Sequence, residues 1–357
     1  MRKTIIRMLI ITVPFTFLLF GCGGAPEPWD NEPVVEMEVE EAVEDESEAD
    51  ESVWGDGELW DEDVDEEVPE EFPVEVSGIH GLISRVEAGD NVMYIFGSMH
   101  YGRPHWFPLH RAVEEAMRRA EAFVFETDIT PEGQQAIAPR MLETMMLPNM
   151  TLSEFLEEDV FHQMMNAVET YGVSYQAIRQ FTPWVVNVFL AEIVYERAGV
   201  TSTYGIDFYV LEFAQFHHLP IFYLNSLEQE MDMVFNLTDE MQHYAALSIE
   251  NLDVAIQQVE RLVAAYETQD IEGLTTLIRE SSITGVVPNP LEEYLIDVIV
   301  IHRSILFAQE MIRLLEQTEE PTTFFVTMGI GHLIGDDHGN VFNYLLDAGF
   351  EVTSLWR

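Results

Sequence analysis

The chain has 357 residues, of which 65 are Asp or Glu and only 16 are Lys or Arg, so its formal charge at pH 7 is −49. A surface this negative repels phosphate backbones, which argues against nucleic acid as a ligand. With only one cysteine, the chain cannot form an internal disulfide, so packing has to hold its fold together.

The N-terminal segment has the pattern of a bacterial lipoprotein signal. Basic residues precede an apolar stretch over residues 8–20, and Leu19-Phe20-Gly21 leads into Cys22. The stretch is too short to span a bilayer comfortably, which favours a cleaved signal over a membrane helix. We therefore expect residues 1–21 to be removed and Cys22 to carry a lipid. An ordinary signal peptide with an incidental cysteine is the alternative.

An acidic segment follows the signal. Residues 23–75 contain 24 Asp or Glu and no Lys or Arg. Such a segment cannot bury enough apolar surface to offset its ordering entropy, and its like charges repel one another. We predict that residues 22–75 are a disordered tether between the lipid and a domain of residues 76–357. The lipid is the only membrane contact that we expect, and it implies an extracytoplasmic location on the bacterial cell membrane.

The domain alternates patterns typical of strands and helices. The sequence predicts strands at 79–86, 92–96, 122–125, 220–224, 323–328 and 350–355, and helices at 108–120, 207–216, 239–268, 271–280, 290–315 and 340–347. The first two strands flank a loop composition that favours a β-hairpin. We predict the α/β class, with a mixed sheet built from both ends of the chain and a large, mostly helical insertion over about residues 131–316.

Two segments with the same spacing each follow a predicted strand. They are Gly97-Ser98-Met99-His100 and Gly329-Ile330-Gly331-His332. Glycine lets the backbone approach a ligand closely, so each loop offers one imidazole at the edge of the sheet. A single histidine is usually a core or surface residue. Two such loops on neighbouring strands, however, would direct His100 and His332 at one point, which favours a metal site.

Two imidazoles usually need a carboxylate to complete a site for a divalent metal, and we expect Mn, Co or Zn. Glu126 directly follows an apolar strand, so we expect it to serve as that carboxylate or as a general base. Asp207 is a further candidate ligand, or it compensates the dipole of the helix that it opens. Arg303 lies inside an apolar helix. It either pairs with a buried carboxylate or stabilises a developing oxyanion.

These segments together resemble the TraB/GumN/PrgY family, which includes the Tiki proteins. The resemblance covers about residues 78–357. It is most specific at residues 329–335, Gly-Ile-Gly-His-Leu-Ile-Gly, and is supported by residues 94–100, 126–128 and 204–207 and by Arg303. The resemblance implies an α/β core with a helical insertion and a site that joins both Gly-x-x-His motifs to Glu126. Tiki relatives are described as metal-dependent proteases, and PrgY-like members are linked to pheromone peptides.

The chain departs from the family pattern at two positions. The family often has Asn where this chain has Ser304, and Glu where this chain has Asn225. Our first hypothesis is a lipid-anchored metal-dependent peptidase, because two separately encoded imidazoles are hard to explain by packing. The loss of an acid at position 225 favours a second hypothesis, a surface lipoprotein that binds or sequesters peptides without turnover. In either case the expected partner is a peptide or protein.

Overall fold

The computed structural model describes residues 78–355, apart from residues 80, 250, 283–289 and 336–338. The predicted signal peptide, the lipid-bearing Cys22 and the acidic tether all lie outside the described residues, so these three expectations stay predictions. None of the helices in the described ranges has both the length and the apolar character that crossing a bilayer requires.

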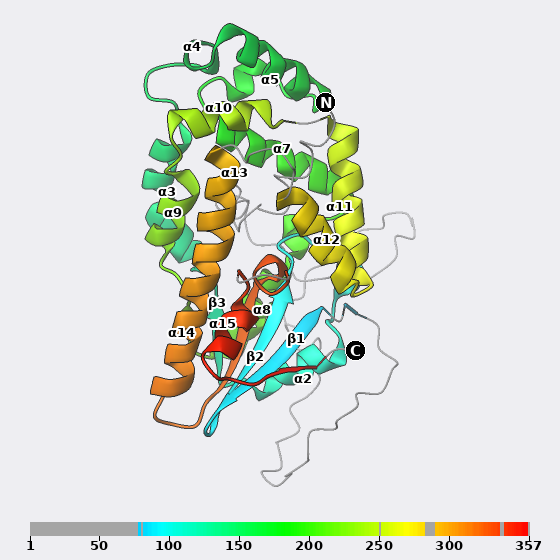
Figure 1. The fold of residues 1–357 in the computed structure, drawn as a ribbon, viewed down its shortest axis with the longest axis vertical. Helices are drawn as coiled ribbons and strands as arrows, with labels where there is room; N and C mark the ends of the chain where they lie inside the picture. The colour runs from blue at the N-terminus through cyan, green and yellow to red at the C-terminus, as the bar shows by residue number, and fades with distance from the viewer. Residues whose placement is uncertain (1–77, 80, 250, 283–289, 336–338, 356–357) are drawn as a thin grey trace, which may run out of the picture. The chain divides into compact units, whose positions relative to one another are not determined.

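A six-stranded mixed sheet forms the centre of the described structure (Figure 1). Its strands are β1 (Leu82–Ala88), β2 (Asn91–Ser98), β3 (Ala122–Phe125), β4 (Ile221–Tyr223), β5 (Thr323–Gly329) and β6 (Val352–Ser354). They lie in the order β4-β3-β5-β2-β1-β6. The four strands from β4 to β2 run parallel, whereas β1 is antiparallel to both β2 and β6. The predicted α/β class and the sheet built from both ends of the chain are confirmed.

The sheet is buried on both faces, which is why its central strands are almost continuously apolar. In β3, Phe123 and Phe125 point into one hydrophobic cluster and Val124 points into another on the opposite face. The β1–β2 hairpin closes through a two-residue turn, in which Gly89 has the positive φ of 61° that this kind of turn favours. The hairpin prediction is therefore confirmed.

Helices account for most of the rest of the described chain. They are α2 (Arg111–Arg119), α3 (Pro131–Met145), α4 (Leu152–Phe155), α5 (Glu158–Thr170), α6 (Tyr175–Ile178), α7 (Pro183–Arg197), α8 (Ile206–Phe216), α9 (Leu227–Phe235), α10 (Asp239–Leu247), α11 (Leu252–Glu267), α12 (Ile271–Ser282), α13 (Pro290–Tyr294), α14 (Arg303–Gln317) and α15 (Val341–Asp347). A π-helical segment, Leu295–His302, joins α13 to α14.

The helices lie on both faces of the sheet and beyond one end of it. Helices α2 and α8 share a hydrophobic cluster with one face, and α14 and α15 cover the other. Many of the remaining helices gather beyond one end of the strands, as Figure 1 shows for α3, α5, α7, α10, α11 and α13. The predicted insertion also contributes β4 to the edge of the sheet, because the helix that precedes β4 returns the chain to β3.

Two predicted helices differ from the structure. The helix expected over residues 239–268 is divided into α10 and α11, because Ser248 ends the first and the Asn251 side chain caps the second. The helix expected over residues 290–315 is continuous, but its middle is widened into the π segment. Such segments are rare and often lie at functional sites, and this one leads directly into Arg303.

Candidate functional site

The carboxyl ends of three adjacent parallel strands bring the candidate residues together. In the paired registers, Ser98 of β2 lies opposite Gly329 of β5, and Phe125 of β3 lies opposite Thr327. Both histidine loops and Glu126 therefore follow the carboxyl ends of adjacent strands, at the same end of the sheet. The prediction that the two Gly-x-x-His motifs follow neighbouring strands is confirmed, although no sequence pattern had specified which strands would be neighbours.

Asp207 fixes the orientation of the first histidine. Nδ1 of His100 lies 2.8 Å from one Asp207 oxygen, and the Ser98 hydroxyl donates to the other at 2.8 Å. When His100 is neutral, its proton stays on Nδ1 because the carboxylate accepts it, so Nε2 carries the lone pair. Burial alone would lower the pKa of His100, but the nearby Asp207 carboxylate outweighs this and raises it. Because Ser98 donates to the acid and not to the imidazole, these residues do not form a serine-hydrolase triad.

This geometry changes the role that we expected for Asp207. One of its oxygens accepts from the Ser98 hydroxyl and the other contacts Nδ1 of His100. Carboxylates commonly hold metal-binding histidines in this way. The structure therefore gives Asp207 the role of orienting His100, and the expectation that it is itself a metal ligand stays a prediction.

Ser304 orients the second histidine in a comparable way. Its hydroxyl donates to the carbonyl of Val300 at 2.7 Å, so its oxygen accepts from Nδ1 of His332 at 3.0 Å. The lone pair of His332 is then on Nε2, which lies 3.9 Å from Glu126 Oε1. Burial, assisted by the neighbouring Arg303 and His100, lowers the pKa of His332 to about 4, so the ring is neutral at pH 7. Ser304, where the family often has Asn, therefore orients the His332 ring in this chain.

Glu126 is held as an ionised carboxylate. Arg303 Nη2 donates to its Oε2 at 2.7 Å, and the Gly329 N–H donates to its Oε1 at 2.6 Å. Burial works to raise its pKa, but Arg303 and the two histidines outweigh burial and lower it to about 2. A carboxylate with so low a pKa is a poor proton acceptor at pH 7, which favours a ligand role over a role as general base.

Glu126 and His100 both lie close to Gly329, and His332 Nε2 lies 3.9 Å from the same Glu126 oxygen. A Cβ added to this glycine would lie 3.3 Å from Glu126 Oε1 and 3.5 Å from His100 Nε2. The backbone there has φ −54° and ψ 132°, which any residue can adopt, so the glycine serves close approach and not an unusual turn. Among the described residues, no group of three or more His, Cys, Asp or Glu side chains is placed to hold a metal ion. Imidazole nitrogen and carboxylate oxygen are nevertheless donor types that divalent cations such as Zn²⁺ accept.

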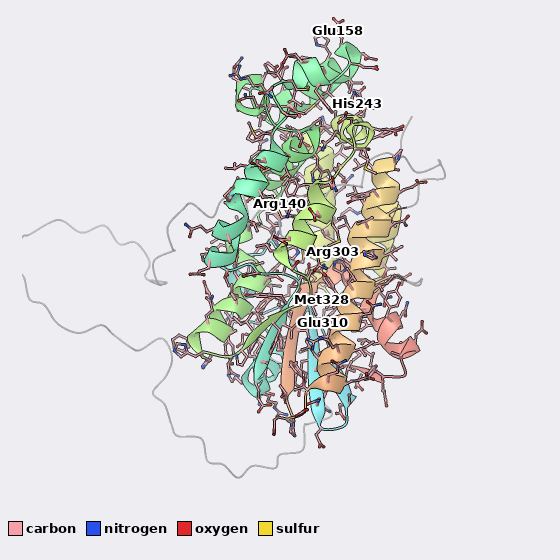
Figure 2. The ribbon with its side chains drawn as sticks, turned by 90° about the vertical axis from the view of Figure 1, so that its left-hand side faces the viewer. Arg140, Glu158, His243, Arg303, Glu310 and Met328 are labelled. Atoms are coloured by element: carbon pink, nitrogen blue, oxygen red, sulfur yellow. The ribbon has the colours of Figure 1, made fainter. Side chains whose placement is uncertain are left out.

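Arg303 is buried between two carboxylates. Besides Glu126, its Nη2 lies 3.1 Å from Oε1 of Glu230 on α9. Figure 2 shows Arg303 beside the end of β5, where Met328 is labelled, with Glu310 further along the same long helix. Of the two alternatives raised by the sequence, the structure shows the pairing with buried acids. A contact with a developing oxyanion stays a prediction.

Sequence reasoning missed Glu230. It lies on the apolar side of α9, since Leu227, Met231 and Val234 recur at helical spacing around it, and this spacing could have identified it as a buried acid. Asn225 is also buried, and its backbone N–H donates to the Glu126 carbonyl at 2.8 Å. Although position 225 is an amide, Glu230 supplies a second carboxylate beside Arg303.

Two residues at the end of helix α11, Tyr266 and Glu267, hold the first histidine loop in place. The Tyr266 hydroxyl donates to the Gly97 carbonyl at 2.7 Å. The next residue, Glu267, accepts from both Arg103 and Trp106 at 2.8 Å. These contacts restrain the loop on either side of His100, as a precisely oriented ligand requires.

A sequence profile of the TraB/PrgY/gumN family matches residues 82–354. The chain belongs to this family. The resemblance inferred from the two histidine motifs is therefore confirmed. The protein YbaP of Escherichia coli K12 is 19% identical over 248 residues, which cover 70% of this chain and 86% of YbaP. YbaP of Shigella flexneri matches with the same identity and coverage, and both are described as uncharacterized. No solved structure matches this TraB/PrgY/gumN chain.

In this TraB/PrgY/gumN protein we expect Asp207→Asn to weaken metal binding by about 10- to 100-fold, as loss of such a partner typically does. The amide can donate to Nδ1 of His100 and so place the ring proton on Nε2. The measurement is a titration with Co²⁺. The exposed Asp253, which also lies in the first turn of a helix, provides the control. If Asp253→Asn weakens binding equally, the effect belongs to helix dipoles and not to His100.

Proposed function

We propose that this protein is an extracytoplasmic, lipid-anchored peptidase that depends on a divalent metal ion. The observation that carries the proposal is the position of Glu126 Oε1, which lies beside Gly329 together with His100 Nε2 and is 3.9 Å from His332 Nε2. Mn²⁺, Co²⁺ or Zn²⁺ would be held by the two Nε2 atoms and by Oε1 of Glu126. When bound, such an ion supplies a Lewis acid that polarises a peptide carbonyl.

The chain's own residues prepare this site in three ways. Asp207 and Ser304 keep the ring protons on Nδ1, so the Nε2 atom of each ring keeps its lone pair for a ligand. Arg303 and the Gly329 N–H keep Glu126 ionised. The buried surroundings strengthen every electrostatic interaction made there. The lipid anchor and the extracytoplasmic location rest on the first 22 residues of the sequence.

The experiment uses the full purified chain, loaded separately with Mn²⁺, Co²⁺ or Zn²⁺ and incubated with a mixed peptide library. Metal content and peptide products are both measured by mass spectrometry. We expect His332→Ala to lose bound metal and cleavage together, because it removes one of two imidazole donors. His162→Ala is the control, since its side chain is 66% exposed on α5 and should change neither.

The same experiment tests the second hypothesis, a peptide-binding protein without turnover. The surface charge suits cationic peptides, so that hypothesis expects salt-sensitive binding with every peptide recovered intact. Shortened peptides that appear only with the wild type and disappear on chelation support the peptidase. Cleavage that survives chelation and His332→Ala contradicts it.

A further inference from the structure

Strand β4 is an open edge of the sheet. It is the outermost strand in the order and pairs only with β3. The carbonyl of Pro220 and the N–H of Leu224 both bond to the β3 backbone. Alternate residues of a strand direct their backbone groups to opposite sides, so the N–H and C=O groups of Ile221 and Tyr223 point away from the sheet. Within the described residues, no other strand pairs with them there.

Apolar side chains flank this edge on both faces. Phe222 is 40% exposed, although its ring contacts that of Phe324 with 6.4 Å between centroids. Ile221 and Tyr223 are only partly buried against the hydrophobic cluster on the opposite face. An apolar edge strand that carries no charge of its own attracts another extended chain. The edge therefore combines the two features of a strand-addition site, which are unpaired backbone groups and apolar surface for alternate side chains.

Acidic side chains lie at the end of β4 that adjoins the candidate site. The Tyr223 hydroxyl donates to Asp128, and the carboxylates of Asp128 and Glu132 add to burial in raising the pKa of Tyr223, so both acids lie near it. Two residues after the strand, the Asn225 N–H donates to the Glu126 carbonyl at 2.8 Å. A chain that lies along this edge towards the site thus meets negative charge, which favours basic side chains on that chain.

We propose that an extended, basic segment of the peptide substrate adds to the sheet beside β4. The inference deepens the proposed function and rests on it, because the paired segment belongs to the peptide that the site would cleave. A second copy of the chain fits the edge less well, because two chains of formal charge −49 repel each other. Backbone hydrogen bonds to Ile221 and Tyr223 supply affinity for many sequences, and the flanking side chains select among them.

The distance between β4 and the site sets a minimum length for the substrate. Strands in a sheet lie about 4.8 Å apart, so a segment beside β4 lies three spacings, or about 14 Å, from β5. An extended chain covers this distance with about four residues. We therefore expect the cleaved bond to lie at least about four residues away from the paired segment.

The first test measures binding to the full wild-type chain by fluorescence anisotropy, with a chelator present so that no turnover occurs. The probe is a labelled peptide of alternating valine and lysine, about twelve residues long so that it exceeds the expected span. A second probe carries N-methyl groups on its central residues, which removes backbone donors and keeps the side chains. We expect it to bind at least about 5-fold more weakly. Equal affinities would overturn the inference.

A third probe of alternating valine and glutamate tests the charge. It should bind more weakly than the lysine probe at low salt, and this difference should shrink as salt is added. If the glutamate probe binds as well as the lysine probe, the segment that adds to β4 is not basic and the proposal is wrong.

The second test alters the edge itself. Proline is tolerated at the first residue of a strand, so Ile221→Pro removes one outward N–H and keeps the bonds to β3. Ile221→Ala is the matched control, because it also loses the isoleucine side chain but keeps the N–H. We expect Ile221→Pro to bind the lysine probe about 2- to 10-fold more weakly than Ile221→Ala. Equal binding contradicts the inference, and if Ile221→Pro fails to fold, the N-methylated probe decides.

The outcomes separate this inference from the peptidase function. A metal-loaded wild type that binds the lysine probe but cleaves no peptide contradicts the peptidase and leaves peptide docking at β4 standing. Cleavage with the same KM in Ile221→Pro and Ile221→Ala contradicts the docking and leaves the peptidase standing. A wild type that dimerises in analytical ultracentrifugation, with Ile221→Pro monomeric, would assign the edge to a second copy and overturn the inference.

Discussion

Replacing Gly329 with alanine is expected to weaken cation binding and turnover strongly while leaving the protein folded. The new methyl group would lie 3.3 Å from Glu126 Oε1 and 3.5 Å from His100 Nε2, inside the space that these groups border. Because the backbone conformation at Gly329 is open to any residue, the substitution adds little strain to the strand. We expect kcat/KM to fall by at least about 10²-fold, the usual effect of displacing reacting groups by an ångström.

Gly331 provides an unusually close control for this prediction. It lies two residues later in the same motif, and a Cβ added there would meet no atom within 4 Å. The measurements are Co²⁺ affinity, kcat/KM and melting temperature for both variants. The prediction requires Gly331→Ala to behave as wild type in binding and in turnover. Wild-type Co²⁺ affinity in Gly329→Ala would show that the ligand site lies elsewhere.

The largest effect on stability is expected from Arg303→Met. The substitution keeps much of the side-chain volume but leaves Glu126 and Glu230 buried without their shared guanidinium. Removing one partner of a buried ion pair typically costs about 3–5 kcal/mol of unfolding free energy. Arg303 also lies over the Phe307 ring, 5.0 Å from its centroid, so a cation–π contact is lost as well. Urea unfolding measures the change.

Arg313→Met on the same helix is the control. Arg313 pairs with Glu310 at the surface, where the loss of such a pair costs about 0–1 kcal/mol. The double substitution Arg303→Met with Glu230→Gln should recover part of the loss, since it removes one of the two uncompensated acids. An unfolding midpoint of Arg303→Met equal to that of the wild type would show that the three buried side chains do not interact as described.

The centre of the sheet could be predicted from sequence because the strands β2, β3 and β5 are short, buried and mostly apolar, a pattern that depends on local residues alone. The order of the strands could not, since the contact between β2 and β5 joins residues more than two hundred positions apart. The π segment was also beyond prediction. Residues 295–302 are apolar on nearly every side, so no periodicity distinguishes a wide helical turn from an ordinary one.

The candidate site was predictable at positions where a histidine or an acid follows closely after an apolar strand. His100, His332 and Glu126 follow apolar strands, and the parallel sheet brings such positions to one edge. The role of Asp207 was not predictable, because an acid beside a ligand and an acid that is a ligand have the same sequence pattern. Glu230 required knowledge of its tertiary partner. Its helical spacing marks it as buried, but only the folded chain places it against Arg303.

The central position of β5 has a consequence for when the sheet can form. This strand lies between β3 and β2, yet it begins at Thr323, and His332 follows it close to the C-terminus. A nascent chain that has not yet emerged to this point has neither the middle of its sheet nor its second imidazole. The sheet can therefore close only after residues 323–329 have been synthesised, and a chain that stops before them lacks both its central strand and His332.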